Sequence, residues 1–295
     1  MDAAPHASVL LEQVLDVLQP RPGVGFRALD CTIGAGGHSY ALLERSSPDG
    51  RLVGLDADAD ALQLAARRLE PFKDRFALLN RNFADLAELG LGAFDAILFD
   101  LGLSSMQLES SGRGFSFSAD EPLDMRFDPG SGGPTAADLL NRLRQAELER
   151  VLRDYGEEPR ARRLALRIVQ RRANRRFERT SDLVAAVTAA LGPAHGRIHP
   201  ATRTFQALRI AVNDELGALQ AGLDAAVQLL QPGGRLAAIS FHSLEDRIVK
   251  WRLRAWADDG VVRILTRKPV TPTQDEIHAN PRARSAKLRV AERLA

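Results

Sequence analysis

The chain has 295 residues, 45% of them hydrophobic, and this length suits one large domain or two smaller ones. Its apolar runs are broken by Asp well short of the roughly 20 residues that a membrane helix requires, and the start MDAAPHAS shows no basic and apolar leader. We therefore expect a cytoplasmic protein without membrane contact. The single cysteine, Cys31, excludes an intrachain disulfide and a thiolate metal cage and suits a buried, inert thiol; no residue cluster implies a required metal.

The first hundred residues alternate between helical and strand patterns. Helices are predicted over 9–18, 38–45 and 59–69, and strands over 26–30, 51–56, 76–80 and 94–100. Such alternation calls for a parallel sheet, in which ligands gather at the carboxyl ends of the strands. Asp30, Asp56 and Asp100 stand at three of these ends and together predict a functional edge, although each alone suits a helix cap or a turn.

The strand rhythm is interrupted after residue 103. Residues 104–134 are rich in Gly, Ser, Asp and Pro and predict a long ordered loop, and residues 135–191 are predicted to be helical throughout. A helix over 204–230, a strand over 235–240 and a closing pair of strands over 261–268 and 286–294 follow. We predict a discontinuous α/β domain of residues 1–105 and 206–295, with an inserted loop and all-helical domain of residues 106–205.

Basic residues are concentrated in two segments. Nine arginines and one acid, Glu178, lie between Arg160 and Arg179, and this excess predicts docking of an anionic partner, with a solvated helix face as the alternative. A second cluster near the C-terminus offers another place for phosphates, namely Arg282, Arg284, Lys287, Arg289 and Arg293.

The stretch LDCTIGAGGHS joins a predicted strand to a predicted helix. Gly34, Gly36 and Gly37 let the backbone approach a bulky ligand, and Asp56 ends the next strand at about the spacing from which an acid meets a ribose diol. The ligand predicted is a nucleoside. S-adenosylmethionine suits the stretch better than NAD, because the third glycine of a dinucleotide fingerprint would fall at Ser39. The alternative is a tight turn followed by a helix that Asp56 caps.

At this point the sequence resembles a known family, ribosomal RNA small subunit methyltransferase H, also called the MraW family. The matching stretches run in order along the chain: HASVLLEQVL, DCTIGAGGHS, GLDADADAL, FDLGLSSMQL, RGFSFSADEPLDMRFDP, YGEEPRARRLALRIV, HPATRTFQALRIAVNDEL, LQPGGRLAAISFHSLEDRIVK and NPRARSAKLRVAER. The resemblance implies a Rossmann-like class I S-adenosylmethionine methyltransferase sheet with a helical insertion. It also implies methyl transfer to the exocyclic N4 of a cytidine in the decoding region of small-subunit (16S) ribosomal RNA, with RNA in the assembled subunit as the expected partner.

The resemblance also implies roles for single residues. Gly36, Gly37 and His38 would contact the cofactor, Asp56 would hold its ribose, Phe83 would stack on the adenine, and Asp100 and Gln107 would complete the pocket. Without it, His38 is a helix-start residue and Phe83 a core residue.

The group that binds the cytidine amine is left open by the sequence. Amino methyltransferases on DNA carry an acidic or polar residue followed by two prolines and an aromatic, whereas this chain has DLGLSS. Asp100 is the best candidate for the acceptor, with Ser104 and Ser105 as secondary ones that equally suit helix caps. His242 could position the base or bond locally in a turn.

The target base must be single-stranded or flipped out. Arg113, Phe115 and Phe117 offer cationic and stacking groups for this base, and the alternative for Phe115 and Phe117 is a hydrophobic plug that ties the loop to the insertion. A nicotinamide-dependent oxidoreductase, a non-catalytic RNA-binding factor and a methyltransferase acting on DNA or protein remain as alternative functions.

Overall fold

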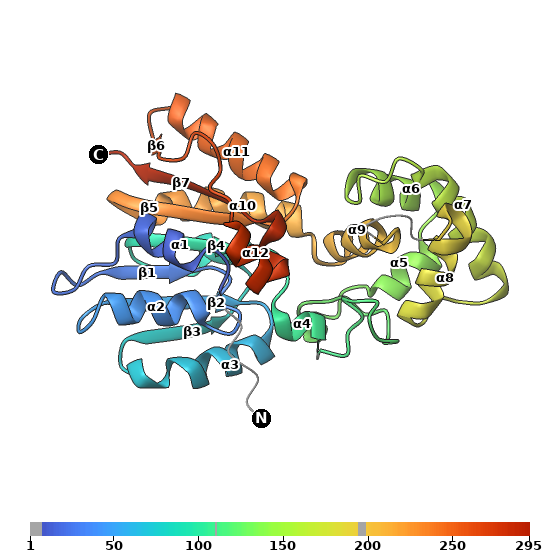
Figure 1. Cartoon of the computed structure of the whole chain (residues 1–295), viewed down its shortest axis with the longest axis horizontal. Coiled ribbons are helices and arrows are strands. Elements are labelled where there is room, and N and C mark those ends of the chain that lie inside the picture. Colours follow the sequence, from blue (N-terminus) through green and yellow to red (C-terminus); the bar gives the residue numbers. More distant parts are fainter. Residues whose placement is uncertain (1–7, 110, 194–198) are drawn as a thin grey trace. The chain divides into compact units, whose positions relative to one another are not determined.

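The computed structural model describes residues 8–109, 111–193 and 199–295, which divide into two units (Figure 1). The first contains the described residues up to Gly102 together with Leu216–Ala295, and the second is Leu103–Glu215. The chain thus returns to the first unit at Leu216 and not at residue 206, because the helix over 201–213 packs in the core of the second unit.

The first unit is built on a seven-stranded sheet in the order β3-β2-β1-β4-β5-β7-β6 (Figure 1). Its strands are β1 Arg27–Asp30, β2 Arg51–Asp56, β3 Phe76–Asn80, β4 Phe94–Asp100, β5 Leu230–Ser240, β6 Val262–Ile264 and β7 Lys287–Arg293. The pairs among β1 to β5 are parallel, and β7 pairs antiparallel with both β5 and β6. The predicted parallel sheet and closing strand pair are confirmed, with β6 shorter than expected.

Helices cover both faces of this sheet because its strands are apolar on both sides. The helices of the unit are α1 Leu11–Leu18, α2 Gly37–Arg45, α3 Ala59–Leu69, α10 Glu215–Leu229, α11 Ser243–Asp258 and α12 Gln274–Ala279, with 3-10 turns η1 Glu70–Phe72, η2 Phe83–Glu88 and η4 Pro281–Ser285. Along β4, Ala96 and Leu98 pack in the cluster of α1, α2 and α3, whereas Ile97 and Phe99 pack in the cluster of α10 and α11. The alternation follows from the period of two in a strand.

The helices in the last third of the chain depart from the prediction. The helix expected over 204–230 is broken at Asp214, whose φ of 46° lies in the left-handed region, so that α9 Ala201–Asn213 ends before α10 begins. The sixteen-residue helix α11 was not predicted at all, although SFHSLED carries a capping signal at its start.

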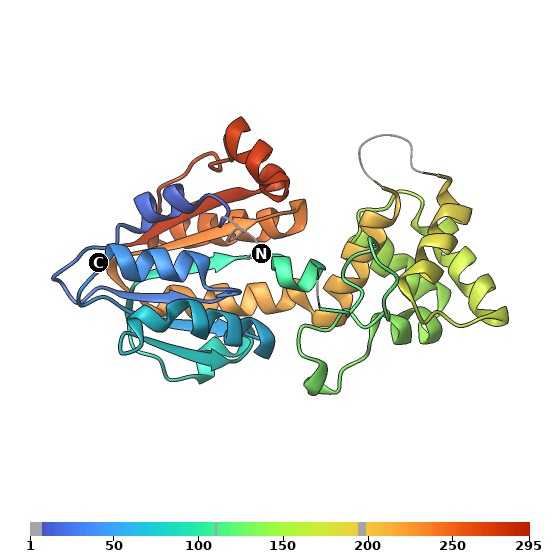
Figure 2. The same cartoon turned by 60° about the horizontal axis from the view of Figure 1, so that its bottom comes forward.

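The second unit is helical, with a long loop before its main helices. It contains α4 Ser105–Glu109, η3 Pro129–Ser131, α5 Ala136–Arg142, α6 Gln145–Asp154, α7 Ala161–Asn174, α8 Thr180–Leu191 and α9. In Figure 2 the loop between α4 and α5 is green, and the helices after it run from green to yellow. Phe115, Leu123 and Met125 of this loop are buried in the helical core, so the loop is a packed part of the unit.

None of the helices in the described residues combines the length and the apolar character needed to cross a bilayer.

The core of the second unit can be tested with two leucines of α7. Leu164 is fully buried and Leu166 is 43% exposed. We expect Leu164→Ala to lower the free energy of unfolding of this unit by about 2–5 kcal/mol, because it leaves a cavity. Leu166→Ala, the matched control, should change it by less than about 0.5 kcal/mol. Urea unfolding followed by circular dichroism measures both, and equal losses would contradict the packing described.

Candidate active site

The glycine loop between β1 and α2 brings backbone close to α3. Gly36 precedes α2 with a φ of 78°, and a Cβ there would lie 3.3 Å from the Cα of Ala65. A Cβ at Gly37 would overlap the hydroxyl of Ser8. A side chain at either position would disturb the start of α2. With glycine at both positions, α2 begins at the carboxyl edge of the sheet, where its first N–H groups lie.

Asp56 at the end of β2 holds this loop in place. The N–H groups of Gly34 and Asp58 each donate to its carboxylate at 2.9 Å. Burial raises the pKa of Asp56 to about 6, against the lowering effect of these two N–H donors. The alternative for Asp56, a cap on the following helix, is wrong, because Asp58 caps α3 by accepting from the N–H of Asp60.

His38 and Asp100 form a pair beside the loop. His38 is buried, its Nε2 lies 3.0 Å from the carbonyl of Val9, and its Nδ1 lies 3.3 Å from Oδ2 of Asp100. Burial opposes the charged imidazole, but the hydrogen bond and charge of Asp100 outweigh it and raise the pKa of His38. Among the described residues, the buried Oδ1 of Asp100 has no hydrogen-bond partner, so this atom is available to a ligand.

Asp30 at the end of β1 and the hydroxyl groups of Thr32 and Ser39 lie around the pair. The Ser39 hydroxyl donates to Asp30 at 2.6 Å, and the N–H of Asp100 donates to the Thr32 hydroxyl at 2.6 Å. Burial raises the pKa of the Asp30 carboxyl above its ordinary value. Thr32 and Ser39 were not predicted as site residues, although both hydroxyls flank the glycines in the printed stretch. The structure therefore brings together Gly36, Gly37, His38, Asp56 and Asp100.

Phe83 and Gln107 lie in different surroundings. Phe83 is partly buried in η2, with its ring edge-on to Phe99 at 5.6 Å between centroids and against Gly222 of α10. Gln107 belongs to the second unit, where it is buried and its Oε1 accepts from the N–H of Ser104. Their predicted cofactor contacts stay predictions.

The remaining polar candidates have local partners. His242 precedes α11, and its Nδ1 accepts from the N–H of Glu245 at 3.3 Å, which is the local turn bond that the sequence left open. The Ser104 hydroxyl accepts from the N–H of Gln107 and so caps α4. The Ser105 side chain lies outside the described part of the structure.

The loop predicted to stack on the target base is largely used in folding. Arg113 is buried, donates to the carbonyl of Phe127 and lies over the ring of Phe115, which itself stacks on Phe127 at 5.7 Å. For Phe115 the hydrophobic plug is confirmed and the stacking role is wrong, and the Arg113 guanidinium is bonded within the loop itself. Phe117 is 36% exposed and contacts the rings of His199 and Phe205.

Eight of the nine arginines in the arginine-rich segment fall into two groups. Arg171 pairs with Asp182 at 2.7 Å, Arg179 pairs with Asp120 at 2.6 Å, and Arg172 donates to the Leu140 carbonyl. Arg160 donates to the Leu191 carbonyl, and Arg175 lies 3.8 Å from Asp182. Within the described residues, three exposed arginines of α7 have no acidic partner: Arg162, Arg163 and Arg167. The second basic cluster serves mainly to hold β7, since Lys287 and Arg289 both pair with Asp246.

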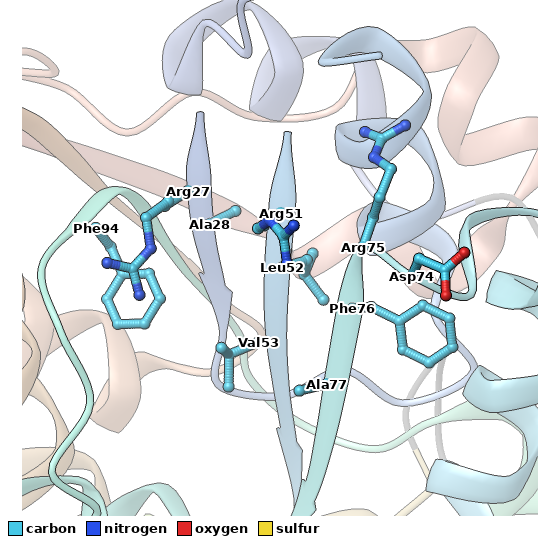
Figure 3. Close-up of a pocket in the computed structure, with 10 residues that line it drawn as sticks. All are labelled: Arg27, Ala28, Arg51, Leu52, Val53, Asp74, Arg75, Phe76, Ala77 and Phe94. Atoms are coloured by element: carbon cyan, nitrogen blue, oxygen red, sulfur yellow. The ribbon is translucent and has the colours of Figure 1, made fainter. Parts of the chain in front are cut away.

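A separate cavity of about 170 Å³ opens at the opposite edge of the sheet (Figure 3). It lies at the amino ends of the strands and is lined by Arg27, Arg51, Asp74, Arg75, Phe76 and Phe94 among others. Arg75 is committed to the Leu43 and Gly50 carbonyls, and Arg27 covers the Phe94 ring. Ligands of parallel sheets bind at the carboxyl edge, so the carboxylate cluster and not this cavity is the candidate active site.

These features define the class of protein. A parallel sheet with a glycine loop after β1 and an acid ending β2 is the arrangement that binds a nucleoside cofactor. The nearby carboxylates of Asp30, Asp56 and Asp100 favour a cofactor with positive charge over one with a pyrophosphate. The fold and the site together are those of an α/β methyltransferase.

Comparison with known proteins identifies the family. Residues 3–294 match the model of the MraW methylase family. Ribosomal RNA small subunit methyltransferase H from Heliobacterium modesticaldum is 51% identical over 98% of both chains, and that from Geobacter sulfurreducens is 50% identical over 98% of this chain and 99% of its own. This chain belongs to the MraW methylase family. The predicted family, the Rossmann-like class I fold and S-adenosylmethionine as cofactor are thereby confirmed, and the nicotinamide alternative is excluded.

Solved structures are more distant. A crystal structure of an rRNA methylase described as putative, from Clostridium thermocellum, shares 13% of its sequence, with a TM-score of 0.48, over 97% of this chain and 98% of its own.

The raised pKa of Asp56 gives a test of its role. If Asp56 accepts the ribose hydroxyls, only its ionised form binds well, so affinity for S-adenosylhomocysteine should fall as the pH drops below about 6. The loss should approach about tenfold for each pH unit below the pKa. Calorimetry between pH 5 and 8 measures it. Asp56→Asn should bind S-adenosylhomocysteine weakly and without this pH dependence. If the affinity of the wild-type protein does not change between pH 5 and 8, the assignment is contradicted.

Proposed function

We propose that this protein transfers a methyl group from S-adenosylmethionine to the exocyclic N4 of a cytidine in the decoding region of small-subunit ribosomal RNA. The relatives near 50% identity, each named as a small-subunit ribosomal RNA methyltransferase, support the RNA substrate. The observation that carries the atom-level proposal is the buried Oδ1 of Asp100, which lacks a partner in the described structure at the carboxyl edge of the sheet.

The cofactor fits the residues at this edge. Gly36 and Gly37 let the start of α2 pack closely against Ala65 and Ser8. Each carboxylate oxygen of Asp56 accepts one backbone N–H and keeps capacity for a ribose hydroxyl. S-adenosylmethionine supplies a methyl group on positively charged sulfur, and the sulfur keeps the bonding electrons and leaves as a neutral thioether when the new bond to nitrogen forms.

Asp100 polarises the nucleophile. The N4 lone pair of cytidine is delocalised into the ring, so it attacks weakly until an acceptor draws on the amino hydrogens. Oδ1 of Asp100 accepts one of these hydrogens while the N–C bond forms, and it receives the proton that N4 then loses. Alignment of the two reactants lowers the activation barrier by several more kcal/mol.

His38 holds the acceptor. With the Val9 carbonyl fixing one ring nitrogen, the other is directed at Oδ2 of Asp100, which leaves Oδ1 for substrate. In this role His38 is a positioning residue.

Asp100→Asn tests the chemical step. It should lower the rate of N4 methylation by about 10²–10³-fold, as loss of a positioned charge-stabilising group does, and leave S-adenosylhomocysteine binding largely intact. The assay incubates protein with methyl-labelled S-adenosylmethionine and small subunits from cells lacking the activity, then identifies labelled nucleosides by mass spectrometry. Asp60→Asn on the exposed start of α3 is the matched control. Label on another atom, or only in DNA or protein, would overturn the proposal.

The partnerless arginines of α7 test RNA binding. Replacing Arg162, Arg163 and Arg167 by Ala should weaken binding to small-subunit RNA and lower the salt slope by about 2, because each lost phosphate contact removes about 0.7. The matched control removes the same charge from arginines that pair with acids on α5 and α6: Arg142, Arg144 and Arg153. Filter binding at several salt concentrations measures both triple variants, and equal slopes in the two would contradict the role of α7.

A further inference from the structure

The exposed face of α11 carries an unusual side chain for a protein surface. Trp251 is 56% exposed, whereas Trp256, the other tryptophan, is partly buried against the core of the first unit. The helix is anchored without Trp251, since Val249 and Leu253 are buried in this core and Leu244 is buried as well. Large aromatic side chains that do not serve the core and remain in water mark binding surfaces.

The surroundings of Trp251 are basic. The ammonium of Lys250 lies 5.4 Å from the ring centroid and the guanidinium of Arg254 lies 5.2 Å from it. Arg247, one turn earlier on the same face, is also exposed. Within the described residues, neither Lys250 nor Arg254 has an acidic partner, in contrast to Arg252, which pairs with Asp224 at 2.9 Å.

The basic face of α11 begins close to the edge of the sheet that carries Asp100. α11 begins directly after β5, at the carboxyl edge where Asp100 ends β4, and both lie in the first unit. At 1.5 Å per residue, Trp251 lies about 12 Å along the helix from Ser243. The basic face thus starts near the reactive edge, and it stops before Asp258, an exposed acid at the end of α11.

We propose that Lys250, Trp251 and Arg254 form a binding surface for the single-stranded RNA that flanks the target nucleotide. A base stacks on the Trp251 ring and the two cations neutralise neighbouring phosphates. An aromatic platform between cations is the pattern that binds single strands without sequence preference. This inference rests on the proposed function, because it assumes that the substrate is RNA.

Fluorescence of Trp251 provides the direct test. In Trp256→Phe, Trp251 is the only tryptophan, and a single-stranded oligocytidylate of about ten nucleotides should quench its emission on stacking. Trp251→Ala should weaken binding of this RNA by roughly tenfold, the equivalent of one stacked base, and Trp251→Phe should keep most of the affinity. Affinity for S-adenosylhomocysteine should stay unchanged in all three variants.

Arg254→Ala and Arg252→Ala are a matched pair on the same helix. The first should weaken RNA binding and the second should not. Wild-type affinity in both Trp251→Ala and Arg254→Ala would overturn this inference and leave the proposed function standing. Absence of N4 label from small subunits would instead overturn the proposed function, whether or not the oligocytidylate binds to Trp251. Self-association that is lost in Trp251→Ala would assign the face to a second copy of the chain and so also overturn the inference.

Discussion

The candidate site depends on the imidazole of His38, held between a backbone carbonyl and a carboxylate. Both ring nitrogens face acceptors, and a buried ring in this position is most stable when both carry protons. The bonds join the segment before α1, the first turn of α2 and the end of β4. Because buried polar groups must keep their partners, the glycine loop, the N-terminal segment and Asp100 have to be correctly placed together.

The same constraint explains the choice of cofactor. Asp30, Asp56 and Asp100 bring three carboxylates to one edge, opposed by a single imidazole, and the pKa of both Asp30 and Asp56 is raised because burial disfavours their charge. A positive sulfonium group relieves this excess of negative charge, whereas a pyrophosphate would add to it. Electrostatics therefore distinguishes S-adenosylmethionine from NAD on a sheet that either could use.

Sequence patterns predicted the parts of the site that depend on local structure. Strand period placed Asp56 and Asp100 at strand ends, and the glycines marked the loop. The pairing of His38 with Asp100 was out of reach because it joins residues that only the folded sheet brings together. Arg113 and Phe115 were misassigned for the related reason that a Gly- and Ser-rich segment has the composition of an exposed loop, while its few large side chains are buried by the helices that follow. Composition does not reveal such packing.

The number of arginines in the sequence likewise overstates the number that are free of acidic partners in the fold. If nine phosphates were contacted by the segment between Arg160 and Arg179, the salt slope for a single strand would be about 6, whereas the three partnerless arginines of α7 account for about 2. The paired arginines have already exchanged hydration for carboxylates and carbonyls, so using them for RNA would cost the fold those bonds. In the proposed function, RNA affinity is then built from small surfaces on separate elements. There α7 contributes charge alone, whereas α11 adds an aromatic ring that holds a base in one orientation, as the proposed reaction at a single exocyclic nitrogen requires.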